Sequence, residues 1–465
     1  MPEQPSHNKM NHLNRLRDIP AVERVLQALG EADAPRPALV AVVRRELAAL
    51  RKEKDVPDFD GVLARIRSAL DALGHSRIQP VINGTGIIVH TNLGRSPLGP
   101  AVVETLQSIA SNYNNLEFDL TGGERGGRAA YLEHNLALVC GAEGATVVNN
   151  CAAALVLVLR HFTPGERKEV IISRGELIQI GGGFRIPEIL EAGGAKLREI
   201  GTTNKTALDD YGRTIGKQTA MILKVHRSNF FMGGFVESPA TEEIAALAKK
   251  KRLPLVEDLG SGAVVTTEKL TDIEHEPTPA EVLKRGVDLV CFSGDKLFGG
   301  PQAGIIAGKA KWVAALRKEP FFRALRCDKL ILSALQTTVD LYLNGQATES
   351  VPALVMLRTS NEDLLARARR ILTALEALPM KSAIGGGKAQ IGGGTLPRSS
   401  IPSITLDLQP LNIPLDDFAA RLRAGTPPVI GYIADGRYKL DLRTVFPRQD
   451  ENLFQAIHHV FGNIG

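Results

Sequence analysis

The chain is poor in cysteine and in aromatic residues, and it has no long apolar run. It holds 4 cysteines in 465 residues, none in a C-x-x-C pair, so nothing indicates a zinc ribbon or a dithiol redox site. Isolated cysteines of this kind are typical of small buried side chains in a reducing compartment. No stretch approaches the ~20 apolar residues that span a bilayer, and residues 1–17 lack the apolar core of a secretory signal. We therefore expect a cytoplasmic protein with no membrane partner and no metal site.

Two common nucleotide-binding motifs are also missing. No G-x-x-x-x-G-K-[ST] sequence occurs, which argues against a P-loop, and no G-x-G-x-x-G follows a predicted strand, which disfavours a nicotinamide enzyme. An excess of charge of one sign is missing too, because the formal net charge is only +5. This mild basic balance permits a polyanionic partner without demonstrating one, and no DNA partner is expected.

Three regions that differ in glycine content and in the spacing of apolar residues predict three domains. Residues 1–76 are glycine-poor with apolar residues at helical spacing, which predicts a helical module whose 12 Lys and Arg nearly balance 11 Asp and Glu. Residues 77–345 alternate short apolar runs with amphipathic helices, which predicts an α/β domain with a mostly parallel sheet and helices on both faces. Residues 346–465 predict a smaller α+β domain.

Local patterns predict individual elements within the last two regions. Buried strands are expected at residues 145–148, 169–173, 220–225, 253–257 and 288–293, and helices at 152–161 and 241–251. In the C-terminal region, the glycine-rich segments 385–387 and 392–394 are expected to be connectors, and Asp435-Gly436 is expected to form a hairpin turn.

Three polar residues follow three successive predicted strands. Lys296 carries an amine that can condense with an aldehyde, and partial burial would let it act as a base. Asp258 can keep the ring nitrogen of pyridoxal phosphate protonated, and Asn229 is placed to hydrogen-bond the ring hydroxyl. Each residue alone is as readily a turn or cap residue. Together, in this order, they indicate the cofactor site of an aspartate-aminotransferase-like (fold type I) enzyme.

The phosphate of this cofactor needs a site rich in donors. Asn150, Cys151 and Ala152 lie where a predicted strand leads into a helix of small residues. The N-terminus of a helix offers free backbone N–H groups and the positive end of the dipole, so we expect these residues to bind the phosphate.

Several long motifs resemble the bacterial selenocysteine synthase family, the L-seryl-tRNA(Sec) selenium transferases. They lie at residues 83–95, 113–119, 123–128, 173–177, 183–187 and around Lys296, and the similarity continues to 441–445 and so covers essentially the whole chain. The resemblance implies an enzyme with pyridoxal 5′-phosphate on Lys296 that converts seryl-tRNA(Sec) to selenocysteinyl-tRNA(Sec). Water would leave the serine by β-elimination to give an aminoacrylate, to which selenium from selenophosphate adds. The resemblance also implies a homodecamer with active sites between subunits, and an N-terminal module that binds tRNA.

The resemblance assigns a selenium-donor site as well. Arg95, Arg323 and Arg326 match arginines with which the family lines this site, and Asp295 matches an aspartate of the same site. Forked guanidinium groups bind phosphate-like oxygens bidentately, which suits selenophosphate. Without the resemblance, the last two arginines would be read as a solvated basic face. Lys296 and Asp295 are the predicted catalytic residues.

Two alternatives remain open. The first is a β-eliminating lyase for a small molecule on the same scaffold, which the N-terminal module disfavours because a free amino acid needs no such arm. The second is a non-catalytic RNA-binding scaffold, which the presence of Lys296, Asp258 and Asn229 disfavours.

Overall fold

The computed structural model describes residues 19–31, 34–53, 55–179, 183 and 185–462, which form two compact units divided between Pro80 and Val81. The first unit contains α2 (Val22–Leu29), α3 (Arg36–Leu50) and α4 (Phe59–His75). Their facing sides pack the fully buried Val25, Val43 and Ile66 against one another. The helices expected in this region are therefore present, while residues 1–18 of the predicted module lie outside the described residues.

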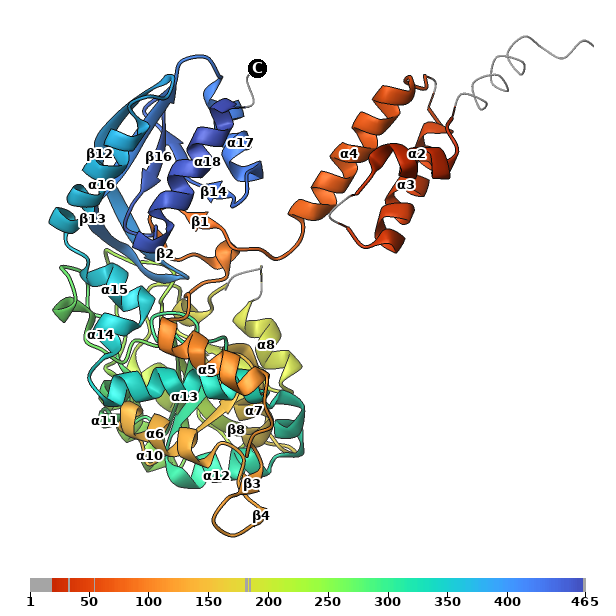
Figure 1. The fold of residues 1–465 in the computed structure, drawn as a ribbon. Coiled ribbons are helices and arrows are strands. Elements are labelled where there is room, and N and C mark those ends of the chain that lie inside the picture. The colour runs from red at the N-terminus through yellow and green to blue at the C-terminus, as the bar shows by residue number, and fades with distance from the viewer. Residues whose placement is uncertain (1–18, 32–33, 54, 180–182, 184, 463–465) are drawn as a thin grey trace, which may run out of the picture. The chain divides into compact units, whose positions relative to one another are not determined.

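The second unit contains a seven-stranded sheet, of which β8 is labelled in Figure 1. Its strands, in spatial order, are β5 (Gly144–Val148), β11 (Gly304–Gly308), β10 (Leu289–Ser293), β9 (Leu255–Gly260), β8 (Thr219–Val225), β6 (Glu169–Ser173) and β7 (Lys196–Ile200). All neighbours are parallel except β11, which is antiparallel to both β10 and β5. The predicted α/β class and the five predicted strands are confirmed.

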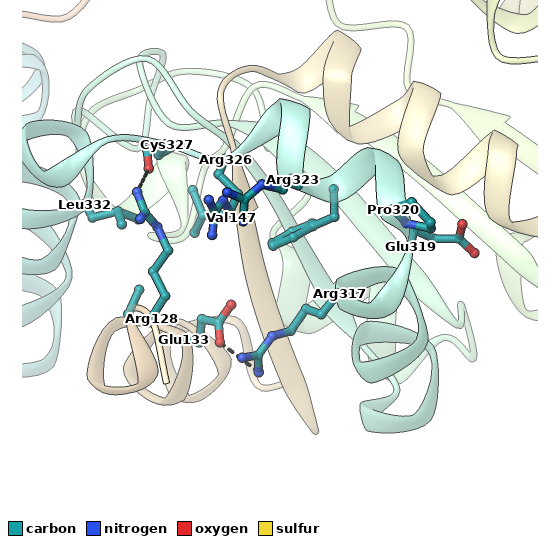
Figure 2. A pocket seen from close by; sticks show the side chains of 12 residues that line it. Arg128, Glu133, Val147, Arg317, Glu319, Pro320, Arg323, Arg326, Cys327 and Leu332 are labelled. Carbon is teal, nitrogen blue, oxygen red and sulfur yellow. Dashed lines mark hydrogen bonds and ion pairs between the residues drawn. The ribbon is translucent and has the colours of Figure 1, made fainter. Parts of the chain in front are cut away.

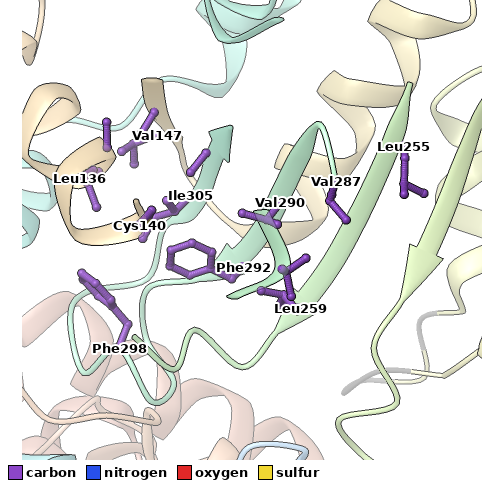
Figure 3. Close-up of a cluster of buried hydrophobic side chains, with 14 of the residues drawn as sticks. Leu136, Cys140, Val147, Leu255, Leu259, Val287, Val290, Phe292, Phe298 and Ile305 are labelled. Atoms are coloured by element: carbon purple, nitrogen blue, oxygen red, sulfur yellow. The ribbon is translucent and has the colours of Figure 1, made fainter. Parts of the chain in front are cut away.

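Helices cover both faces of this sheet because alternate strand residues point to opposite sides. On one face, side chains such as Val290 and Phe292 pack against helices, as Figure 3 shows. The helices of this face are α6 (Ala130–Cys140), α9 (Leu208–Thr214), α10 (Thr241–Lys251), α11 (Pro279–Lys284) and α13 (Lys329–Leu343), and α5 (Pro100–Ala110) packs on α13. The other face is covered by α7 (Cys151–Phe162), α8 (Ile186–Ala192) and α12 (Ala310–Lys318).

A second sheet is built mainly from the C-terminal region. Its strands, in spatial order, are β15 (Tyr432–Ala434), β16 (Arg437–Asp441), β13 (Thr395–Pro410), β12 (Met380–Gly392) and β2 (Ile87–Val89). One face packs on α16 (Asn361–Leu375), α17 (Leu415–Ala424) and α18 (Asp450–Gly462), visible in Figure 1. β1 (Ile82–Asn83) pairs in parallel with β14 (Val429–Ile430). Residues 82–89, assigned from sequence to the large domain, therefore pair with strands of the C-terminal region.

Short elements complete the unit. They are the hairpin of β3 (Phe118–Asp119) and β4 (Glu124–Arg125), and the helices α14 (Ala347–Ser350) and α15 (Pro352–Arg358), which link the two sheets along the chain. Among the residues that the structure describes, no helix is long and apolar enough to cross a membrane.

The glycine-rich segments of the C-terminal region have two different roles. Gly392–Gly394 joins β12 to β13 as expected, but the prediction for residues 385–387 is wrong, because they lie inside β12. A Cβ atom at Gly385 would lie 2.5 Å from Oδ2 of Asp407 on the neighbouring strand, so the carboxylate occupies the space of a side chain. Asp435-Gly436 forms the expected two-residue turn, with φ of 53° and 68°.

Candidate active site

A cavity of about 790 Å³ lies at the carboxyl ends of β8, β9 and β10. Because these strands are parallel neighbours in the sheet, Asn229, Asp258 and Lys296 meet at one edge. Asn229 and Lys296 follow β8 and β10 as expected, whereas Asp258 lies inside β9, two residues before its end, and not after it. Eight of the ten predicted site residues line the cavity: Arg95, Asn150, Cys151, Ala152, Asn229, Asp258, Asp295 and Lys296. These eight predicted residues thus lie around one cavity.

The backbone around Lys296 is held by a distant segment of the chain. The Ser96 hydroxyl donates to the carbonyl oxygen of Lys296 at 2.5 Å, and the Ser96 N–H donates to that of Asp295 at 3.2 Å. The Arg95 guanidinium donates to Oδ2 of Asp295 at 2.7 Å. Asp295 is only 7% exposed, and its Oδ1 has no hydrogen-bond partner among the described residues. The structure therefore joins two predicted donor-site residues, Arg95 and Asp295, as a direct ion pair.

Asp258 lies beside both Lys296 and Cys151. The Cys151 thiol donates to Oδ1 of Asp258 at 3.5 Å. Burial raises the pKa of the Asp258 carboxyl above its ordinary value, and the nearby Lys296 amine partly opposes that rise. A buried carboxylate in this condition is stabilised by a further cation, and the protonated ring nitrogen of pyridoxal phosphate is such a group.

The N-terminus of α7 opens into the same cavity. Asn150 caps the helix, with its side-chain oxygen accepting the Ala153 N–H at 2.8 Å. The N–H groups of Cys151 and Ala152 lie in the first turn, where no carbonyl of the helix can accept them. Gly304 on β11 lies directly behind, since a Cβ atom there would be 2.0 Å from the Asn150 carbonyl oxygen. The arrangement suits the phosphate of the cofactor.

Asn229 offers an unfilled acceptor at the cavity wall. Its side-chain nitrogen donates to the Gln179 carbonyl at 2.7 Å. Its Oδ1 is buried and has no hydrogen-bond partner among the described residues. An orphaned buried acceptor costs about 1–3 kcal/mol, so a donor such as the ring hydroxyl of the cofactor would relieve it. The residues present therefore fit pyridoxal phosphate at the ring nitrogen, the ring hydroxyl and the phosphate.

Several ionisable residues in and beside the cavity were not predicted from the sequence. His226 lines it, and its Nε2 lies 3.3 Å from Oε1 of Glu276, which is 1% exposed. Lys224 on β8 pairs with Glu257 on β9 at 2.9 Å. The last two fall inside predicted buried strands, and charge at such positions was a signal that could have found them.

Arg323 and Arg326 line a different cavity, of about 390 Å³, shown in Figure 2. Arg323 lies in a 3-10 helix, Pro320–Leu325, and Arg326 follows it directly. Nη1 of Arg326 lies 3.4 Å from Oε1 of Glu117, which also pairs with Arg125 and Arg128. Within one chain, these two arginines therefore do not line the cavity that Arg95 lines. A donor site that contains all three arginines stays a prediction.

No cluster of His, Cys, Asp or Glu within the described ranges could hold a metal ion.

The fold and the cavity define the class: an aspartate-aminotransferase-like enzyme of fold type I. D-Glucosaminate-6-phosphate ammonia-lyase shares this fold, with a TM-score of 0.59 and 20% identity over 85% of this chain and 99% of that chain.

Comparison with known sequences identifies the family. The SelA model, described as L-seryl-tRNA selenium transferase, matches residues 81–446, and so begins where the second unit begins. The L-seryl-tRNA(Sec) selenium transferase of Carboxydothermus hydrogenoformans is 41% identical over 93% of this chain and 95% of its own. The enzyme of Geobacter sulfurreducens is 43% identical over 95% of this chain and 98% of its own. The chain belongs to the L-seryl-tRNA selenium transferase family.

Proposed function

We propose that this protein converts L-seryl-tRNA(Sec) to L-selenocysteinyl-tRNA(Sec), with pyridoxal 5′-phosphate on Lys296 and selenophosphate as the selenium donor. The observation that carries the proposal is the single cavity in which Lys296, Asp258 and Asn229 meet at three adjacent strand ends. Family membership supplies the substrate, because the relatives are named for seryl-tRNA(Sec). Pyridoxal phosphate, when bound, supplies an electron sink that lets the serine lose its α-proton and its β-hydroxyl.

Each residue of the cavity has its own role in binding the cofactor or moving a proton. Asp258 keeps a proton on the ring nitrogen, Asn229 accepts the ring hydroxyl, and the first turn of α7 binds the phosphate. Lys296 would hold the cofactor covalently, and its amine, when free, would remove the α-proton and later return a proton. The position of each group in the cavity supports these roles.

The Arg95–Asp295 pair is proposed to receive the selenium donor. Among the described residues, Asp295 is the hydrogen-bond partner of the Arg95 guanidinium, through Nη1 at 2.7 Å, so its other N–H groups are available to a ligand. A forked guanidinium with free N–H groups binds an oxyanion bidentately. The same proposal includes a homodecamer, in which Arg323 and Arg326 of one subunit complete the donor site that Arg95 and Asp295 form in another subunit.

The N-terminal unit is proposed to bind tRNA in the cytoplasm. Arg44 and Arg45 are exposed on α3, and Arg67 is exposed on α4. Because the module is nearly neutral overall, its contacts depend on a few local arginines and on RNA shape more than on bulk charge. The small-molecule lyase alternative has the same cavity and differs only in needing no such unit.

The test is turnover by the purified holoenzyme. Seryl-tRNA(Sec) with selenophosphate should yield selenocysteinyl-tRNA(Sec), whereas seryl-tRNA(Ser) should yield none. The Lys296→Ala variant is the matched inactive control. Elimination of water from free serine or another small amino acid, with no reaction on seryl-tRNA(Sec), would establish the lyase instead.

A further inference from the structure

Glu276 is a buried carboxylate to which the proposed mechanism gives no role. It is 1% exposed, and neither of its carboxylate oxygens has a hydrogen-bond partner among the described residues. Its backbone is fixed, because the Glu276 N–H donates to the Thr267 hydroxyl at 2.9 Å and that hydroxyl donates to the Glu274 carbonyl oxygen at 2.9 Å. A buried charge without hydrogen bonds is costly unless a cation lies beside it. Glu276 therefore needs a cationic partner.

His226 can be that partner. Its Nε2 lies 3.3 Å from Oε1 of Glu276, which is the one ion-pair contact of this carboxylate in the part of the chain that the structure describes. His226 follows β8 directly, and its backbone N–H donates to the carbonyl oxygen of Asp258 on β9 at 2.8 Å. The residue lines the cavity together with Asp258 and Lys296. His226 thus contacts a buried carboxylate and borders the cofactor cavity.

The charge of the imidazole affects Asp258. Burial raises the pKa of the Asp258 carboxyl, and the Lys296 amine and the His226 imidazole are among the groups that oppose this rise. A positively charged imidazole therefore favours the carboxylate form of Asp258. A carboxylate next to an imidazole favours the charged form of the ring in the same way. Glu276, His226 and Asp258 are thus linked electrostatically.

The contacts of Glu276 argue against a purely structural role. The hydroxyl of Thr267 holds the segment, whereas the carboxylate of Glu276 makes no hydrogen bond to any described residue. Apolar side chains of similar volume can often replace a buried ion pair without loss of stability. A charge at this position is therefore better explained by its effect on the cavity.

We propose that Glu276 and His226 are positioning residues that keep Asp258 charged opposite the ring nitrogen of pyridoxal phosphate. Glu276 orients the imidazole through Nε2 and favours its charged form, and the imidazole favours the carboxylate form of Asp258. The proton shared by Asp258 and the ring nitrogen then lies on the nitrogen, where it makes the ring a stronger electron sink. The inference rests on the proposed role of Asp258 and adds the two residues that set its charge.

The experiment detects the proton on the cofactor directly. The wild type and the variants Glu276→Gln and His226→Gln are loaded with pyridoxal phosphate that carries ¹⁵N in its ring, and the ¹⁵N chemical shift is measured by solid-state NMR. The wild type should show the shift of a protonated pyridine ring. In each variant the shift should move toward that of an unprotonated ring, because Asp258 then holds the proton.

A kinetic measurement separates rate from binding. With saturating seryl-tRNA(Sec), α-proton exchange should fall by roughly 10- to 100-fold in both variants, the loss typical when the outer partner of a metal ligand is removed. The KM should not change, because neither residue is proposed to touch the tRNA. The double variant should lose no more than either single variant, because the two residues act in series.

A second carboxylate–histidine pair on the same segment provides the matched control. Glu268 lies 2.9 Å from Nδ1 of His275, but the two side chains are 44% and 38% exposed and do not line the cavity. Glu268→Gln should therefore keep the wild-type ¹⁵N shift and the wild-type exchange rate.

Two results would overturn the inference. One is a wild-type ¹⁵N shift in either folded variant. The other is loss of the cooperative thermal transition in both variants, which would make the pair a structural support of the cavity. An unprotonated ring in the wild type would count against the proposed role of Asp258 itself. If the wild type carries the cofactor on Lys296 but does not act on seryl-tRNA(Sec), the proposed substrate is wrong, and the ¹⁵N shifts still decide the inference.

Discussion

Replacing Glu176 by glutamine tests the buried charges behind the cavity. Glu176 is 4% exposed, and its Oε2 accepts the backbone N–H of Val225, the last residue of β8, at 3.1 Å. Burial raises the pKa of the Glu176 carboxyl from 4.5 to about 6, although the Lys224 ammonium opposes the rise. Glutamine keeps an acceptor for the Val225 N–H and carries no charge.

The sign and size of the effect follow from the two pKa values. The folded chain holds the Glu176 proton more tightly than the unfolded chain, so this contribution to stability is fully present below pH 4.5 and is lost as pH rises through 6. At ~1.4 kcal/mol per pKa unit, the loss amounts to about 2 kcal/mol at high pH. The glutamine variant has no carboxyl to ionise and does not lose this stability, so at high pH it should be more stable than the wild type.

Thermal unfolding of both proteins between pH 5 and pH 8 measures the difference. The advantage of Glu176→Gln should grow from under ~1 kcal/mol at pH 5 to about 2 kcal/mol at pH 8, or roughly 2–3 °C in Tm for a unit of this size. Glu104→Gln, at an exposed position on α5, should show no such trend. A variant that is less stable at pH 8, or a difference independent of pH, would refute the reasoning, because Lys224 would then hold Glu176 in its charged form at no cost.

Four further outcomes are expected. Borohydride should fix the cofactor to the peptide of Lys296, and Lys296→Ala should be colourless; label on another lysine would disprove the assignment. Asp258→Ala should bind the cofactor but lose α-proton exchange by orders of magnitude, measured by deuterium uptake, and normal exchange would place the nitrogen partner elsewhere. Deleting residues 1–80 should spare the colour and abolish tight binding of tRNA(Sec) in gel shifts, whereas unchanged affinity would favour the lyase. Co-assembled Lys296→Ala and Arg323→Ala chains should recover activity that neither has alone, unless the donor site lies within one chain.

The strand ends of the candidate site were predictable because their order in the sequence is their order in the sheet. β8, β9 and β10 are consecutive neighbours, so Asn229, Asp258 and Lys296 meet without any long-range pairing being known. The local pattern of apolar runs also gave the strands themselves. β7 was not predicted, because most of its residues are exposed at the edge of the sheet and therefore do not form an apolar run.

Contacts between distant segments were not predictable from local patterns. Arg95 meets Asp295 across 200 residues, and β1 joins β14 near the other end of the chain. Glycines at 385–387 signal a connector by composition, yet these residues pair with residues 403–405 of β13, and the carboxylates of Asp407 and Asp441 fill the space beside the first and the last of them. In each case the conformation of the segment depends on a residue that is distant in the sequence. The residues next to the segment do not indicate which distant residue it contacts.

The two arginine sets illustrate why a donor site is harder to derive than a cofactor site. Arg95 is fixed by Asp295 in one cavity, while Arg326 shares Glu117 with two other arginines beside the second cavity. The guanidinium of Arg128 and its neighbours hold the pKa of the Glu117 carboxyl below its ordinary value, so that carboxylate stays charged, yet it cannot neutralise three cations. An excess of guanidinium groups suits an oxyanion, but each cavity alone has only part of the set that the family resemblance assigns to selenophosphate. In the proposal made above, a second copy of the chain completes the set, and neither the sequence nor the fold of one chain specifies where that copy binds.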